Sequence, residues 1–282
     1  KIEVTNLPDA NKLLRRSYDL YQQVYGVNYV WANRARMLLA KNLVKQNKLA
    51  EARPFIDLTL EKSELLFGRT IWWGNAKIAE AEYDVAAGNS AGALEAYRAY
   101  AGVAAKERYA CYFGNCLLPY IDLLQGQAAK QPAKAAAFQS EAFAAAQLAD
   151  SSVVFAAIDQ LSARIAARDP QIAAIARDQQ DNGEQILRAR AELAAELGKK
   201  AAERNAARAA ELRHKVEALD AASAQQELQL QDRYPTYAQL LNRQAIGVAA
   251  VAKLLRPDEG LLVYTNLITK GYSFLIYKGQ VQ

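Results

Sequence analysis

Apolar residues recur at spacings of three and four along most of the chain, a pattern that predicts amphipathic helices. In the first third, WANRARMLLAKNLVKQNKLAEA (31–52) and WWGNAKIAEAEYDVAAGNSAGA (72–93) each predict a helix, a short polar turn and the start of another helix. The pattern changes near the C-terminus. There, GLLVYTNL (260–267) and YSFLIYKG (272–279) are apolar, β-branched and aromatic runs that predict two strands. We therefore expect a mostly α-helical protein with a short C-terminal β-hairpin.

The helical segments of the first third repeat along the sequence. Ala10 corresponds to Ala52 and Gly26 to Gly68, both 42 positions apart, and Ala93 follows Ala52 by 41. A fixed period of this length is typical of stacked helix pairs, because one pair cannot bury its own apolar face. An irregular helical bundle is the alternative, and the doubled period disfavours it. The first unit begins within its second helix.

Two sets of residues are expected to form the contacts of this array. Small side chains should let paired helices approach closely, at Ala40, Ala52, Ala81 and Ala93. Larger side chains should fill the space between units, at Leu39, Leu43, Ile56, Leu60 and Tyr97.

The middle of the chain divides into two parts. Residues 109–169 continue the helical pattern without clean repeats, and residues 170–233 are dense in charge. Within the charged part, two apolar seams have heptad-like spacing: Ile186, Leu193 and Leu197, then Leu212, Val216 and Leu219. The seam weakens over 198–202, which predicts the tip of a long antiparallel helical hairpin. One very long helix is the alternative. Farther on, AIGVAAVAKLL (245–255) predicts a short helix packed by Val248, Val251, Leu254 and Leu255.

Composition narrows the functional classes. The chain has 35 basic and 30 acidic residues, a net charge of +5, and both signs are interspersed. This favours solvated helical surfaces over the basic, aromatic-containing patch of a nucleic-acid-binding protein. No run approaches the roughly 18 to 20 apolar residues of a membrane span. The expected partners are therefore proteins or peptides, with no nucleic acid and no membrane span.

Cysteine and histidine offer little chemistry. Cys111 and Cys116 lie close together in CYFGNC, and His214 is the single histidine. Two buried thiols are the favoured interpretation of the cysteines, and a local Cys111–Cys116 disulfide is the second, if a turn separates them. His214 lies in the charged helical segment between Arg213 and Lys215, a surface position, so we expect no catalytic role, no metal site and no cofactor.

The helical repeats resemble the tetratricopeptide repeat (TPR) in its longer form of about 42 residues, through LAEA (49–52) and LFG (66–68). Three later stretches resemble the region that leads from such repeats into the CHAT domain, a bacterial caspase-like cysteine protease module. These stretches are FAAIDQLSARIAARDPQIAAIARDQQD (155–181), the charged coil, and DRYPTYAQLLNRQAIGVAAVAKLLRPDEGLLVY (232–264).

This resemblance implies a division of the chain into four parts. They are TPR-like repeats over 1–108, degenerate helical repeats over 109–169, a long charged hairpin over 170–233, and the start of an incomplete caspase-like α/β domain over 234–282. CHAT proteases use a His–Cys dyad that follows the first strands of the domain. The chain has neither residue there, so we expect no protease activity from this chain itself, whereas the parent protein would be a cysteine peptidase.

Three functional hypotheses follow. The chain is the regulatory and recognition arm of a CHAT protease, a stand-alone TPR adaptor or scaffold, or one part of an active enzyme whose catalytic segment lies elsewhere. A coding sequence that continues past Gln282 with His and Cys would favour the protease, and one that ends there would favour the adaptor. The resemblance implies a bacterial protein. We expect it in the cytoplasm, and export after removal of a signal peptide stays open.

Association and ligand binding are expected at defined places. Homo-oligomers could form through the coil or through the edge of the C-terminal strands, which otherwise pack on the helices or stay poorly ordered. The first helix of each TPR pair lines the inner face of the array. Arg34, Lys41 and Lys45 lie on one side of such a helix, and Asn75 lies at a corresponding place in the next unit. We expect these four residues to bind an acidic or extended peptide.

Overall fold

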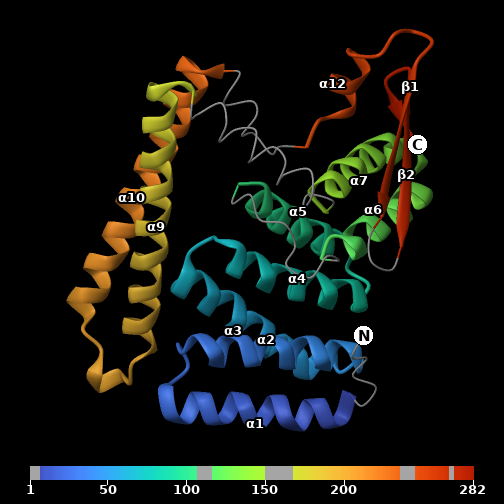
Figure 1. The fold of residues 1–282 in the computed structure, drawn as a ribbon. Coiled ribbons are helices and arrows are strands. Elements are labelled where there is room, and N and C mark those ends of the chain that lie inside the picture. The colour runs from blue at the N-terminus through green and yellow to red at the C-terminus, as the bar shows by residue number, and fades with distance from the viewer. Residues whose placement is uncertain (1–6, 107–115, 150–167, 236–244, 267–269) are drawn as a thin grey trace.

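A computed structural model describes the chain over five ranges: residues 7–106, 116–149, 168–235, 245–266 and 270–282. The described part is mostly helical and ends in a small antiparallel sheet, which confirms the expected balance of helix and strand. Figure 1 shows three regions: a stack of helices, a long helical hairpin standing beside it, and a sheet at the far end of the stack.

The stack begins with five helices joined by short turns: α1 (Leu7–Tyr25), α2 (Val30–Lys45), α3 (Leu49–Phe67), α4 (Ile71–Ala86) and α5 (Ser90–Lys106). Each helix packs against the next, and α2 also contacts α4 directly (Figure 1). Because short connections make sequential neighbours antiparallel, α2 and α4 run in the same direction. The two helices have equal length and begin 41 positions apart, at Val30 and Ile71.

The residues that carry the repeat have physical roles in this stack. The four small residues expected at close helix contacts, Ala40, Ala52, Ala81 and Ala93, are all completely buried. Gly26 and Gly68 follow the last residues of α1 and α3 with φ of +87° and +63°. A side chain is strained in this left-handed region, so glycine ends both helices without that cost.

A buried polar network connects the first three helices. Arg36 on α2 is fully buried, and its Nε donates a hydrogen bond of 3.4 Å to Thr59 Oγ1 on α3. Asn33, one turn earlier, donates to Ser63 Oγ at 2.8 Å. The Arg36 guanidinium also lies 5.7 Å from the ring centroid of Tyr18 on α1. Burial lowers the pKa of Arg36, because removing the guanidinium from water disfavours its charged form.

The stack continues through α6 (Leu118–Lys130), a short 3₁₀ turn η1 (Pro132–Lys134) and α7 (Ala135–Ala149). Glu141 on α7 accepts two hydrogen bonds from Arg98 on α5, at 2.7 and 2.9 Å, and another from the hydroxyl of Tyr120 on α6. Burial opposes ionisation of Glu141, but the bonds from Arg98 and Tyr120 together outweigh it and lower the pKa of the carboxyl. One carboxylate thus connects three helices.

The charged segment forms an antiparallel hairpin of α9 (Pro170–Gly198) and α10 (Ala206–Arg233), with a short 3₁₀ turn η2 (Ala201–Glu203) between them. Asp169 and Asn205 cap the two helix N-termini by accepting backbone N–H bonds. Near the tip, Leu193, Leu197 and Leu212 bury their side chains against Leu66 of α3. The tip of the hairpin therefore packs against the helical stack.

In the last two described ranges, the structure has three strands: β1 (Gly260–Asn266), β2 (Gly271–Tyr277) and β3 (Gln280–Val281), in the order β1-β2-β3 and all antiparallel. The predicted hairpin is present, and the third short strand was not predicted. The preceding helix α12 spans only Val248–Ala252. Leu254 was expected to pack in that helix, but it lies beyond its end and is 81% exposed.

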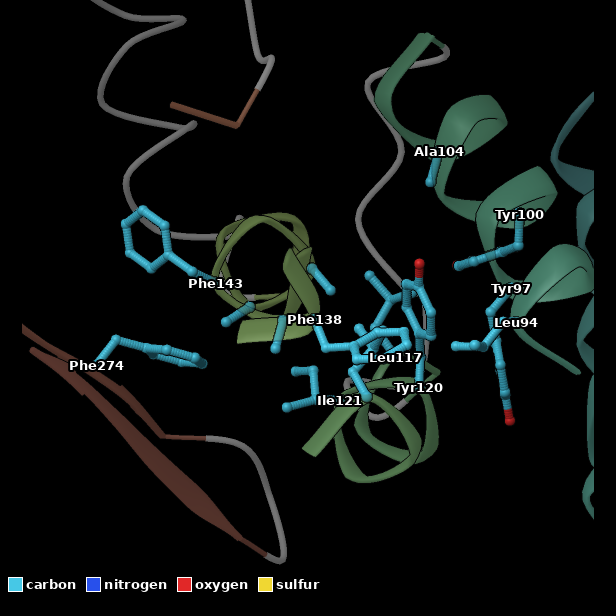
Figure 2. Packing of buried hydrophobic residues seen from close by; sticks show 14 of the residues in the cluster. Leu94, Tyr97, Tyr100, Ala104, Leu117, Tyr120, Ile121, Phe138, Phe143 and Phe274 are labelled. Atoms are coloured by element: carbon cyan, nitrogen blue, oxygen red, sulfur yellow. The ribbon is translucent and has the colours of Figure 1, made fainter. Parts of the chain in front are cut away.

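The sheet packs against the end of the helical stack. Phe274 and Ile276 on β2 are buried in one apolar cluster with side chains of α5, α6 and α7. Figure 2 shows Phe274 pointing from its strand toward Phe143 of α7, and their ring centroids are 5.6 Å apart. Asp122 on α6 also accepts bonds from Lys270 Nζ and from the Tyr272 hydroxyl, both at 2.8 Å. The strands were expected to pack on the helices, to be poorly ordered or to pair with another chain. In the structure they pack on the helices.

Candidate functional site

The four predicted partner-binding residues lie on two helices that are neighbours in the stack. Arg34 and Lys45 are exposed on α2, Lys41 is partly buried on the same face, and Asn75 is partly buried on α4. Asn75 is the fifth residue of α4, and Arg34 is the fifth residue of α2. α2 and α4 are in contact and run in the same direction, so these residues occupy corresponding sides of neighbouring helices, and we call this surface the α2–α4 face.

Lys41 was expected to be available to a ligand, but the structure pairs it within the protein. Its Nζ lies 2.9 Å from Glu82 Oε1 on α4, and the two side chains are only 28% and 26% exposed. A ligand carboxylate would have to compete with Glu82 for this ammonium group. The predicted stripe therefore consists of two exposed cations, Arg34 and Lys45, with an internal ion pair between them.

The charge on α2 is one-sided. Its sequence, VWANRARMLLAKNLVK, contains four cations and no carboxylate. Arg36 is buried in the core, so three of these cations contribute to the α2–α4 face. A neighbouring helix supplies Glu82 as the counter-charge of Lys41, whereas the exposed Arg34 and Lys45 are suited to an anionic group from outside the chain.

Sequence reasoning missed the apolar members of this face. Trp31 is 50% exposed, Trp72 is 49% exposed, and Leu38 between Arg34 and Lys41 is 40% exposed. The guanidinium of Arg34 lies over the Trp31 ring, 5.8 Å from its centroid. The available signal was the recurrence of tryptophan at the same place in two units, 41 positions apart. The α2–α4 face thus combines cations, an amide and half-exposed aromatic rings.

A concave region lies apart from this face, between the C-terminal end of α3 and the hairpin, with a volume of about 990 Å³. Its charged groups are largely neutralised within the protein. Arg190 on α9 forms two bonds to Asp220 on α10, at 3.0 and 3.1 Å, and Arg69 bonds to Glu64 at 2.9 Å. These pairs make the groove less suited to a charged ligand than the α2–α4 face.

The residues considered for other chemistry lie apart from this face. His214 is exposed on α10. Cys116, just before α6, is disulfide-bonded, so the favoured interpretation of a buried thiol is wrong for this residue. Cys111 lies outside the described residues. Over the ranges that the structure describes, no group of three or more His, Cys, Asp or Glu side chains could hold a metal ion. In the same ranges, every helix is too short or too polar to cross a bilayer.

Comparison with known proteins does not extend this picture. A scan against protein-family models, a search of curated proteins and a search of solved structures each found no match. The function is therefore argued from the geometry of the α2–α4 face and from the sequence resemblance.

Proposed function

We propose that the chain recognises an acidic, extended segment of a partner protein through the α2–α4 face. The observation that carries this proposal is the one-sided charge of α2, which exposes Arg34 and Lys45 and contains no carboxylate. Asn75 on the neighbouring helix adds an amide that can bond to a peptide backbone. Stacked helices supply a rigid surface, so little conformational entropy is lost by the receptor on binding.

The wider role that we propose is the recognition arm of a bacterial CHAT-family cysteine protease. Support comes from the order of parts, since a helical stack, a charged hairpin and a small sheet follow one another as that resemblance implies. Contacts through Phe274 and Asp122 attach the sheet to the helical stack. A partner bound to the α2–α4 face would therefore sit on the same helical stack that holds the sheet.

The alternative is a stand-alone adaptor without protease activity. Both hypotheses use the same binding face, so peptide binding alone does not separate them. Reading the coding sequence past Gln282 for a histidine and a cysteine after further strands separates them directly. The adaptor hypothesis also accommodates self-association through β1, which is an edge among the described strands.

Calorimetric titration with a peptide of repeating Glu-Gly-Ser triplets tests the binding face. The wild-type chain should bind it, and reversal of both Arg34 and Lys45 to Glu should weaken binding by about tenfold, given the usual size of exposed charge pairs. The matched control reverses Lys200 and Lys253, which are exposed outside this face, and should bind like the wild type. Unchanged affinity in the Arg34/Lys45 variant would refute the assignment of this face.

A further inference from the structure

Two tryptophans occupy equivalent positions on the α2–α4 face. Trp31 is the second residue of α2, Trp72 is the second residue of α4, and their exposed fractions are 50% and 49%. Each ring is held by a neighbour: Arg34 lies over Trp31, and the Phe67 ring stacks on Trp72 with a centroid distance of 5.6 Å. Both rings are thus positioned by the protein while about half of each stays accessible to a ligand.

The exposure of these rings is specific to their position. Trp73, the next residue after Trp72, is only 8% exposed and has cations on its ring, with Lys77 Nζ 5.3 Å and Arg69 Cζ 5.5 Å from its centroid. A single exposed apolar side chain is common on protein surfaces. Two large rings at the same register of adjacent helices form a pattern, and such a pattern marks a contact surface.

The spacing of the helices sets the spacing of the rings. The ion pair between the twelfth residues of the two helices, Lys41 and Glu82, shows that α2 and α4 are in register. Adjacent packed helices have axes about 8 to 10 Å apart. A polyproline II segment has three residues per turn and rises about 3.1 Å per residue, so it presents every third residue on one side about 9 Å apart. One turn of such a segment therefore spans the step from α2 to α4.

The polar groups beside the rings match the same ligand. Arg34 and Asn75 lie three residues after Trp31 and Trp72, on the same side of each helix. Both side chains can donate hydrogen bonds. A proline-rich segment carries solvated carbonyl groups but few N–H groups, so its backbone needs donors from its receptor. Proline rings also pack well on aromatic surfaces, as in other polyproline-binding domains.

We infer that the α2–α4 face binds a proline-rich, acidic segment in the polyproline II conformation, with residues one turn apart seated on Trp31 and Trp72. This inference rests on the proposed function and specifies its ligand. The segment crosses the two helices near their N-terminal ends. Its carbonyl groups accept bonds from Arg34 and Asn75, and its acidic side chains compensate the charge of α2.

Titration with two peptides of equal length and charge tests the inference, one of repeating Glu-Pro-Pro triplets and one of repeating Glu-Gly-Ser triplets. The Glu-Pro-Pro peptide should bind at least about tenfold more tightly. Trp31→Ala and Trp72→Ala should each weaken its binding by about tenfold or more. Both variants should change Glu-Gly-Ser binding by less than about twofold. Tyr264→Ala, which removes an exposed aromatic ring on the sheet, should leave both affinities unchanged.

The outcomes distinguish this inference from the proposed function. If both peptides bind equally and the Arg34/Lys45 reversal weakens both, the proposed function stands and the polyproline inference is wrong. If neither peptide binds, both are wrong. Should an alanine variant melt early, Trp31→Leu or Trp72→Leu replaces it. Full Glu-Pro-Pro affinity in both tryptophan variants would also overturn the inference.

Discussion

Lys41 Nζ lies 2.9 Å from Glu82 Oε1, and this ion pair joins two helices that begin 41 positions apart in the sequence. The paired side chains are the twelfth residues of the two helices, and the same register puts Arg34 and Asn75, and Trp31 and Trp72, at equivalent positions of α2 and α4. The pair also engages Lys41, which the sequence alone had suggested as a ligand-binding cation.

Removal of the internal competitor should strengthen binding. In Glu82→Gln, Lys41 loses its carboxylate partner and becomes available to an acidic peptide. We expect the Glu-Gly-Ser peptide to bind about three- to fivefold more tightly, with a loss of at most about 1 kcal/mol in unfolding free energy. Calorimetry and urea denaturation measure the two quantities. Weaker peptide binding by Glu82→Gln would show that the ion pair supports the ligand-binding geometry instead of competing with the ligand.

The buried Arg36 should contribute mainly through its volume. The Arg36 guanidinium donates to Thr59 Oγ1 and to Asn33 Oδ1. Arg36→Ala leaves a cavity and removes both donors, so we expect it to lower the unfolding free energy by about 3 kcal/mol. Arg36→Met fills the space and avoids burying a cation, so it should cost at least about 1 kcal/mol less than Arg36→Ala. Urea denaturation compares the two. Equal losses would assign the stabilisation to the hydrogen bonds of the guanidinium.

Glu141 should make stability sensitive to acid. Its folded pKa is lowered from the ordinary value of 4.5, so its contribution is present above that value and is lost as pH falls through the folded pKa. Glu141→Gln should lower the unfolding free energy by about 1 to 2 kcal/mol at neutral pH. This difference from wild type should shrink progressively as the pH falls below about 4.5. A difference that is independent of pH would contradict the role assigned to the ionised carboxylate.

The sheet should depend on its buried face. Phe274 is 1% exposed, whereas Tyr264 on the opposite face is 68% exposed. We expect Phe274→Ala to destabilise the chain by about 3 kcal/mol or more, and Tyr264→Ala to change its stability by less than about 0.5 kcal/mol. Limited proteolysis of the last residues should accelerate only in Phe274→Ala. Equal protection of the strands in both variants would show that the contact with Phe143 does not hold the sheet on the stack.

Much of the fold could be predicted because it depends on local patterns. Helices follow from apolar periodicity, the buried alanines from their place in the repeat, and the hairpin connection from the weakened seam near Gly198. These signals lie within a few dozen residues of one another. The packing of the sheet could not be predicted in this way, because it depends on residues far apart in the sequence. Asp122 and Lys270, for example, are 148 positions apart, and no local pattern indicates their contact.

The candidate site was predicted only in part, for the same reason. The helical spacing of Arg34, Lys41 and Lys45 placed them on one face, but the partner of Lys41 depends on how two units stack. The half-exposed state of Trp31 and Trp72 likewise depends on the neighbouring helices. Tryptophan at the start of a helix is compatible with a core position, as Trp73 illustrates, so sequence alone did not single out this pair.

Photo-crosslinking from the α2–α4 face shows whether an acidic peptide binds there. A benzophenone-bearing residue is placed at Leu38, which lies between Arg34 and Lys41, and in a second protein at Leu254, which is exposed outside the face. Both are illuminated with the Glu-Pro-Pro peptide and with the Glu-Gly-Ser peptide, and the products are mapped by mass spectrometry. We expect crosslinking of an acidic peptide from position 38 and none from position 254. Equal capture at both positions, or no capture of either peptide from position 38, would contradict it.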